Sequence, residues 1–137
     1  MTEDIEEIRQ QKMEELRNRA EKGDDVGAVD RSPTEPVPVN GKAELTETVD
    51  EHGIVLVDFY ADWCGPCQML EPVVETIAAE TDATVAKVDI DANQQLAAEY
   101  NVRGVPTLLL FADGQPVERL VGMQEEAQIR SVIEKHA

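Results

Sequence analysis

The chain has 137 residues, which is enough for one domain with a hydrophobic core and too few for two ordinary domains. Its 29 acidic and 12 basic side chains give a net charge of −17, which disfavours nucleic acid and anionic membranes as partners. No apolar run reaches the roughly 18 residues of a membrane span, and the acidic start of the chain is unlike a secretory signal. We therefore expect a cytoplasmic protein that does not bind membranes.

The excess of acidic residues is open to two interpretations. The first is an ordinary acidic cytosolic protein. The second is a halophilic protein, because at 1 M salt the Debye length falls to about 3 Å and repulsion between like charges is screened. Only 5 lysines accompany the 29 acidic residues, and this scarcity favours adaptation to high salt.

The N-terminal part of the chain is predicted to lie outside the main domain. Residues 2–21 place apolar side chains at helical spacing, but the apolar stripe is thin. This helix is either a solvated tail or a docking helix for a partner or a second copy, and its role stays open. Glycine, proline and polar residues make residues 22–36 a linker. We therefore divide the chain into an acidic helix with a flexible linker, residues 1–36, and a domain, residues 37–137.

From residue 37 onward, strand and helix patterns alternate. The predicted elements are a short edge strand around Val37 and Val39, a helix over about 42–52, a strand over 54–60, a helix over 67–79, a strand over 84–90, a helix over 93–100, strands over 107–111 and 117–121 around a turn at Asp113-Gly114, and a helix over 124–136. Strands that alternate with helices pair in parallel through crossovers, and the final hairpin adds antiparallel pairing. The fold class is therefore α/β, with a mixed five-stranded sheet flanked by helices on both faces.

The only two cysteines, Cys64 and Cys67, stand where the strand over 54–60 gives way to a helix. Thiols at this spacing close a small disulfide ring with little movement, and the spacing is typical of redox or metal sites. Zinc usually takes four ligands, and only His52 and His136 remain to supply the others, so we expect no metal. Two cysteines brought to this spacing by chance are the other alternative.

The position of each cysteine in the helix predicts its part in a redox reaction. Free N–H groups at the first turn stabilise a thiolate at Cys64. Cys67 lies one turn further in and is expected to be more covered. We therefore expect Cys64 to attack a disulfide and Cys67 to resolve the mixed disulfide.

Asp58 is the one charged residue in its apolar strand. A buried carboxylate without a partner has a raised pKa, and such a group can take a proton from Cys67 when that thiol attacks. The alternative is an ion pair with Lys87, without any chemical role. Lys87 is the lone charge in Val85-Ala86-Lys87-Val88 of the neighbouring predicted strand. The residues alone leave both alternatives open.

Three segments resemble the thioredoxin family, and the resemblance covers about residues 37–137. They are VDFYADWCGPCQML, VAKVDIDAN and VRGVPTLLLFADG. The resemblance implies a thioredoxin fold and the activity of a thiol-disulfide oxidoreductase. It implies no bound cofactor, because electrons travel as the thiol pair. Its partners would be disulfide-containing target proteins and a separate thioredoxin reductase or an equivalent enzyme.

The resemblance also assigns roles to single residues of the reaction centre. Cys64 matches the nucleophile of the family and Cys67 its resolving thiol. Asp58 matches the buried acid, and Lys87 matches the lysine near it. The Gly-Pro pair between the cysteines is the pair that reducing members of the family carry, so the resemblance implies a reductase.

A docking surface is implied beside Cys64. Pro106 matches the cis-proline of the family, although the sequence alone favours a trans bond. The backbone of Val105 is expected to pair with an extended target segment. The implied surface consists of Gly65, Pro66, Val105, Pro106 and Gly122, with Trp63 at its edge. Trp63 has the alternative role of a packing residue.

Two other functions remain as alternatives to the reductase. In the first, the domain is a binding or scaffold module with incidental thiols, and the N-terminal helix makes the contact. In the second, the cysteine pair serves a disulfide isomerase or oxidase.

Overall fold

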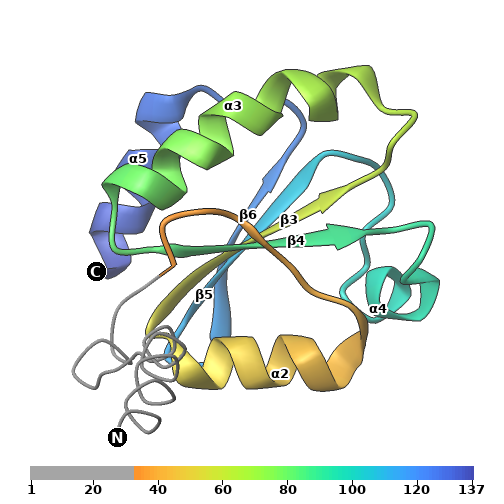
Figure 1. Cartoon of the computed structure of the whole chain (residues 1–137), viewed down its shortest axis with the longest axis horizontal. Helices are drawn as coiled ribbons and strands as arrows, with labels where there is room; N and C mark the ends of the chain where they lie inside the picture. The colour runs from red at the N-terminus through yellow and green to blue at the C-terminus, as the bar shows by residue number, and fades with distance from the viewer. Residues whose placement is uncertain (1–32) are drawn as a thin grey trace, which may run out of the picture. The chain divides into compact units, whose positions relative to one another are not determined.

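Strands and helices alternate along residues 33–137, the part of the chain that the computed structural model describes (Figure 1). The elements are β2 (Val37–Pro38), α2 (Gly41–Glu51), β3 (Ile54–Tyr60), α3 (Gly65–Glu80), β4 (Thr84–Asp89), α4 (Gln94–Glu99), β5 (Thr107–Ala112), β6 (Gln115–Val121) and α5 (Glu126–His136). The helix predicted over residues 2–21 lies outside the described residues, and so does the predicted linker up to residue 32. Residues 33–36 form neither helix nor strand.

The five strands form one mixed sheet in the order β2-β4-β3-β5-β6. β2 and β3 pair with β4 in parallel, whereas β5 pairs antiparallel with β3 and β6. β3 takes the central position because its side chains are apolar on both faces apart from Asp58. A turn at Asp113 and Gly114 joins β5 to β6, and both residues have positive φ, as type I′ hairpin turns require. The predicted fold class and sheet are confirmed.

Helices cover both faces of the sheet, with α3 and α5 on one face and α2 and α4 on the other (Figure 1). Each face has its own hydrophobic core. The core on the α2/α4 face includes Val55, Val57, Phe59, Leu45, Val49, Leu96 and Phe111. The core on the α3/α5 face includes Leu56, Leu108, Leu110, Leu70, Val74, Ile77, Ile129 and Ile133. Asp58 follows Leu56 by two residues and therefore lies on the α3/α5 face.

The helical patterns of the sequence predict that Val73, Tyr100 and Val132 face the core, but these three residues are only partly buried. Val73 and Val132 lie beside fully buried neighbours on α3 and α5, so the apolar stripe of each helix is narrower than its sequence pattern indicates. The ring of Tyr100 packs against that of Phe111, with 5.8 Å between the ring centroids. The Lys42 ammonium lies over the Tyr100 ring, 5.6 Å from its centroid. Its ring therefore closes the edge of the core on the α2/α4 face.

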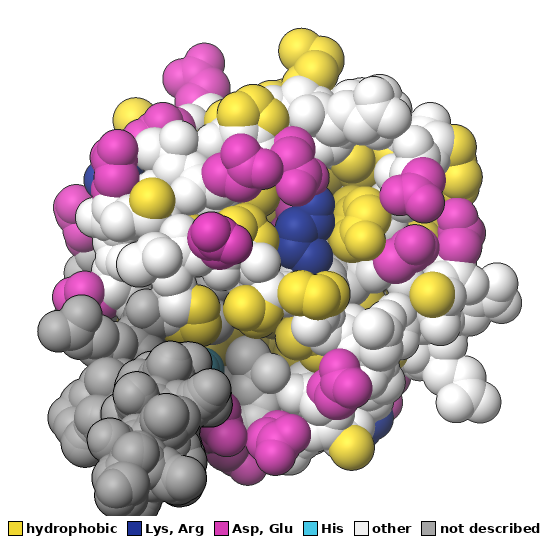
Figure 2. Space-filling view, viewed as in Figure 1, with side chains coloured by type: hydrophobic (Ala, Val, Ile, Leu, Met, Phe, Trp, Pro, Cys, Tyr) yellow, Lys and Arg dark blue, Asp and Glu magenta, His cyan; other side chains and the backbone are white. Residues whose placement is uncertain are grey.

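Acidic side chains are scattered over the face of the molecule that Figure 2 shows, and basic side chains are few there. This distribution agrees with the net charge of −17 for the whole chain. Within residues 33–137, no helix combines the length and the hydrophobicity that a membrane crossing requires.

Candidate functional site

The two cysteines lie at the junction of β3 and α3 and form a disulfide, with 5.3 Å between their Cα atoms. Cys64 is the N-cap of α3, and its Sγ accepts a hydrogen bond of 3.2 Å from the backbone N–H of Cys67. Pro66 occupies the first turn of α3. Backbone N–H groups in the first turn have no partner within the helix, so proline, which lacks an N–H, costs no helical hydrogen bond there. The Cys64 sulfur therefore faces N–H groups and the positive end of the helix dipole, which stabilise a thiolate.

The exposure of the two cysteines differs from the prediction. Cys67 was expected to be more covered than Cys64, but each residue is 4 % exposed. Cys64 is buried because it packs with Ala61 and because Val105, from a distant part of the chain, covers the pair. In the disulfide form, the position in the helix distinguishes the two sulfurs, whereas burial does not.

Asp58 is buried on the α3/α5 face, with 1 % of the residue exposed. Within the described residues, neither of its carboxylate oxygens has a hydrogen-bond partner. Burial raises the pKa of Asp58 to about 6, and the nearby Lys87 ammonium opposes part of this rise. The carboxyl can therefore bind and release a proton close to neutral pH, as acid–base exchange with a thiol requires.

Asp58 and Cys67 both lie in the layer between the sheet and α3. Asp58 is in phase with Leu56 on β3, and Cys67 is one turn before Leu70 and Glu71 on α3. A small pocket of about 100 Å³ opens beside Cys67, and it is lined by Tyr60, Ala61, Asp62, Cys67, Gln68 and Glu71. The pocket has room for water next to Cys67.

Lys87 lies next to Asp58 in the sheet, because the two residues are register partners on β4 and β3. Its Nζ is 3.7 Å from Oδ2 of Asp58, which is an ion pair without a hydrogen bond. The same ammonium donates a hydrogen bond to Glu71 and lies 4.2 Å from the centroid of the Tyr60 ring. Asp58 thus combines features of both alternatives: an ion pair with Lys87, and carboxylate oxygens that accept no hydrogen bond among the described residues.

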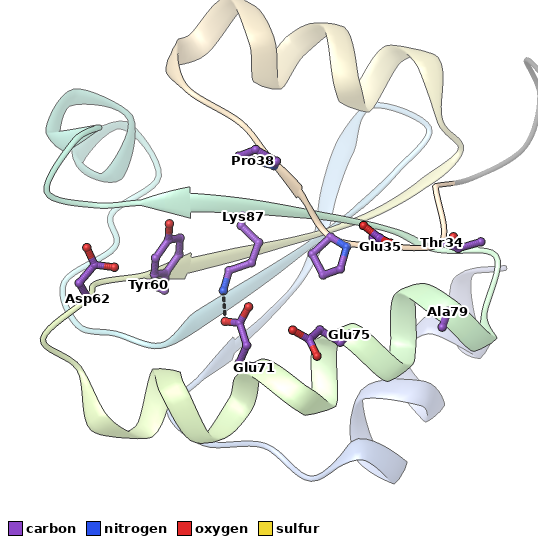
Figure 3. Close-up of a pocket in the computed structure, with 10 residues that line it drawn as sticks. Thr34, Glu35, Pro38, Tyr60, Asp62, Glu71, Glu75, Ala79 and Lys87 are labelled. Carbon is purple, nitrogen blue, oxygen red and sulfur yellow. Dashed lines mark hydrogen bonds and ion pairs between the residues drawn. The ribbon is translucent and has the colours of Figure 1, made fainter. Parts of the chain in front are cut away.

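Glu71 was missed in the sequence, although one signal for it was available. It stands four residues after Cys67, and residues at this spacing lie on the same side of a helix. A charged residue on the same side of α3 as Cys67 is a candidate for influencing the protonation of that thiol. Figure 3 shows its carboxylate meeting Lys87 between α3 and β4.

The segment before β5 contains the residues of the predicted docking edge. The Val105-Pro106 peptide bond is cis, as the family resemblance implied. Val105 packs against the cysteine pair, and the N–H of Gly122 donates a hydrogen bond of 2.9 Å to the carbonyl of Pro106. Gly122 has φ of +88°, which side-chain-bearing residues rarely adopt. Within residues 33–137, the peptide groups of Val105 make no hydrogen bond, so they are available to pair with an added strand.

Trp63 is 69 % exposed, so it does not serve as a core packing residue. Its indole N–H donates a hydrogen bond of 2.9 Å to Asp91, which fixes the ring at the surface. Gly65 and Pro66 are also exposed beside the disulfide. Met69, Val121 and Met123 are further exposed apolar residues.

The described part of the chain contains no group of three or more side chains that could hold a metal ion. His52 lies beside Glu51, and His136 bonds Glu118. The two histidines thus have partners other than the cysteine pair.

Comparisons with known proteins agree on one family. A family model described as thioredoxin matches residues 36–135. A thioredoxin of Staphylococcus aureus is 48 % identical over 88 residues, which cover 63 % of this chain and 85 % of that protein. Among solved structures, a mutant thioredoxin from Halobacterium salinarum is 60 % identical with a TM-score of 0.75, covering 77 % of this chain and 93 % of the other. A thioredoxin of Fasciola hepatica is 38 % identical with a TM-score of 0.69, covering 74 % and 99 %.

The halobacterial relative supports the prediction that this chain is adapted to high salt. The family match spans the whole sheet and includes the cysteine pair, which is at disulfide distance. The chain therefore belongs to the thioredoxin family and is a thiol-disulfide oxidoreductase that exchanges dithiols for disulfides.

Proposed function

We propose that Cys64 is the attacking thiol of a protein-disulfide reductase and that Cys67 resolves the mixed disulfide. The observation that carries this assignment is the position of Cys64 as the N-cap of α3, with its Sγ accepting the N–H of Cys67. The Cys64 thiolate attacks one sulfur of a target disulfide, and the other sulfur leaves as a thiolate. Cys67 then attacks the Cys64 sulfur, which closes the disulfide and releases the second target thiolate.

Asp58 is the proposed proton acceptor when Cys67 becomes a thiolate, and it returns the proton in the reverse direction. Its burial on the α3 side of the sheet and its pKa of about 6 support this role. Lys87 is the nearby cation that moderates the charge of the carboxylate. No bound cofactor takes part, because the electron pair is carried by the two sulfurs.

The target is proposed to dock as an extended segment along Val105. The free peptide groups of Val105 and the exposed Gly65 and Pro66 support such a mode. Trp63 forms one edge of this surface, and Pro106 and Gly122 form the other. The partners are disulfide-containing proteins, and a thioredoxin reductase or an equivalent enzyme in the cytoplasm restores the dithiol.

The function is tested by reduction of insulin disulfides with dithiothreitol as the electron source. We expect the wild type to accelerate the reaction and a Cys64→Ser, Cys67→Ser double variant to match the uncatalysed rate. A Cys67→Ser single variant should accumulate mixed disulfides through Cys64. A wild type no faster than the double variant would refute the reductase and favour a scaffold. A potential well above the reducing range would favour an isomerase or oxidase.

A further inference from the structure

Lys87 faces two carboxylates and forms a hydrogen bond with only one of them. Its ammonium is bonded to Glu71, whereas Oδ2 of Asp58 stays 3.7 Å away. That distance exceeds the roughly 2.7–2.9 Å that is typical of a charge-assisted hydrogen bond. Figure 3 shows the lysine side chain running from β4 toward α3 and ending at Glu71, with the Tyr60 ring nearby. The cation is therefore directed toward α3 and not toward its sheet neighbour.

The choice of partner is informative because the two acids differ in burial. The side chain of Asp58 is 1 % exposed and that of Glu71 is 42 % exposed. Charges attract more strongly where water is excluded, so a buried carboxylate gains more from a close cation than a half-exposed one. Lys87 nevertheless bonds the more exposed acid, and both oxygens of Asp58 are left without a hydrogen bond among residues 33–137.

Among residues 33–137, no basic side chain other than Lys87 forms an ion pair with Asp58. Leu108 is the register partner of Asp58 on β5, and α5 contributes apolar Ile129 and Ile133 to this face. Lys87 also lines a groove of about 880 Å³ between β4 and α3. The other titratable side chains that line this groove or the smaller pocket at Cys67 are Tyr60 from β3, Cys67, Glu71 and Glu75 from α3, and Glu35 and Asp62 from the loops. The position of one ammonium therefore decides how much positive charge the carboxyl experiences.

We propose that Glu71 is a positioning residue for the exchange reaction, because it binds the Lys87 ammonium and holds it off Asp58. This inference rests on the proposed role of Asp58 as the proton partner of Cys67. In that step the S–H bond of Cys67 breaks and its proton passes to an oxygen of Asp58. The Cys67 sulfur then bonds the Cys64 sulfur, and the target sulfur leaves with the electron pair of the broken disulfide. A lysine bonded directly to Asp58 would stabilise the carboxylate and make it a weaker base.

The test removes the charge of Glu71 and keeps its size. In Glu71→Gln, Lys87 loses its ionic partner on α3 and is free to bond Asp58. We expect the carboxyl of Asp58 to titrate about 0.5 to 1 pH unit lower, measured by ¹³C NMR of the full-length oxidised protein. The acid limb of the pH profile for insulin reduction should move in the same direction. Because Glu71 is half-exposed, the substitution leaves the core intact.

Glu75→Gln is the matched control. Glu75 lies one turn further along α3 and lines the same groove, and Figure 3 shows it apart from Lys87. Its substitution removes the same charge from the same helix without releasing the lysine. It should leave the titration of Asp58 and the pH profile close to those of the wild type. Equal shifts in both variants would overturn the inference, since they would reflect only the loss of one negative charge.

A Lys87→Gln background tests whether Glu71 acts through the lysine. In this background, Glu71→Gln should lose most of its effect on the titration of Asp58. If the effect is undiminished in this background, Glu71 does not act through Lys87 and the inference is wrong. The inference is also wrong if Glu71→Gln alone leaves the titration of Asp58 unchanged. If the titration shifts and the pH profile does not, the proposed role of Asp58 fails, and the role of Glu71 in the reaction fails with it. The two failures are thus distinguishable.

Discussion

The two faces of the central strand β3 differ in what they bury. Val55, Val57 and Phe59 enter the core on the α2/α4 face, where the described residues bury no charged side chain. Leu56 and Asp58 enter the α3/α5 face, and Asp58 is the one charged residue among the buried side chains of residues 33–137. The α2/α4 face therefore contributes mainly to stability, whereas the α3/α5 face gives up some stability because it buries a titratable group.

The largest effect on stability is expected from truncating a side chain in the core on the α2/α4 face. Phe59 is fully buried and packs near Tyr100, with 6.4 Å between ring centroids. Phe59→Ala should lower the free energy of unfolding by about 3–5 kcal/mol, because it leaves a cavity in a close-packed core. Urea unfolding measures the loss, and insulin reduction at 25 °C should retain the specific activity of the folded fraction.

Val117→Ala is the control for this substitution. Val117 is partly exposed on β6, so its truncation should change stability by no more than about 0.5 kcal/mol. Loss of activity in folded Phe59→Ala protein would show that the α2/α4 face also takes part in the chemistry.

The next effect concerns the buried carboxyl on the other face. The pKa of Asp58 is raised from 3.8 to about 6, so the folded state binds its proton more tightly than the unfolded state does. The stability that this group contributes is fully present below about pH 3.8 and is lost as the pH rises through 6. Asp58→Asn should therefore gain up to about 3 kcal/mol relative to the wild type between about pH 4 and pH 8.

The measurement is urea unfolding of Asp58→Asn and the wild type at several pH values. The pH dependence of their difference is diagnostic, because contributions from all other titrating groups cancel in it. A difference that stays constant from pH 4 to pH 8 would mean that Asp58 is not the titrating group. Its burial would then have no role in the pH dependence of stability.

The smallest effect is expected from salt, which acts on the surface and on neither core. We expect molar KCl to raise the free energy of unfolding by roughly 1–2 kcal/mol over dilute buffer, because it screens the repulsion among acidic side chains. A rise in Tm of roughly 4–8 °C per kcal/mol would report it. The gain should be the same in the wild type and in Phe59→Ala. A flat response to KCl would contradict the prediction of salt adaptation.

Much of the fold could be predicted because local patterns and packing agree. β3 was predicted with its bounds at Ile54 and Tyr60, since its apolar run begins after Gly53 and ends shortly before Asp62. Helix ends were less accurate. α3 begins at Gly65 and not at Cys67, because the apolar stripe starts later than the backbone hydrogen bonds do.

The sequence could single out candidate site residues, but it could not give their contacts. The cysteine pair, Asp58 and Lys87 could be found because each is unusual within its own element. The equal exposure of the cysteines depends on Val105, about forty residues later in the chain, so no local pattern contains it. The bond between Lys87 and Glu71 likewise joins β4 to α3, and only the tertiary packing brings these two residues together.

Trp63 is an intrinsic fluorescent probe of the cysteine pair. It is the only tryptophan of the chain, it directly precedes Cys64, and its hydrogen bond to Asp91 holds the indole in place at the surface. Emission excited at the indole band therefore originates next to the disulfide. Because the ring is already solvent-exposed in the folded state, its emission maximum should shift little on unfolding. The intensity of its emission should instead change when the disulfide is reduced, when it forms again, and when Cys64 carries a target in a mixed disulfide. No attached label is needed.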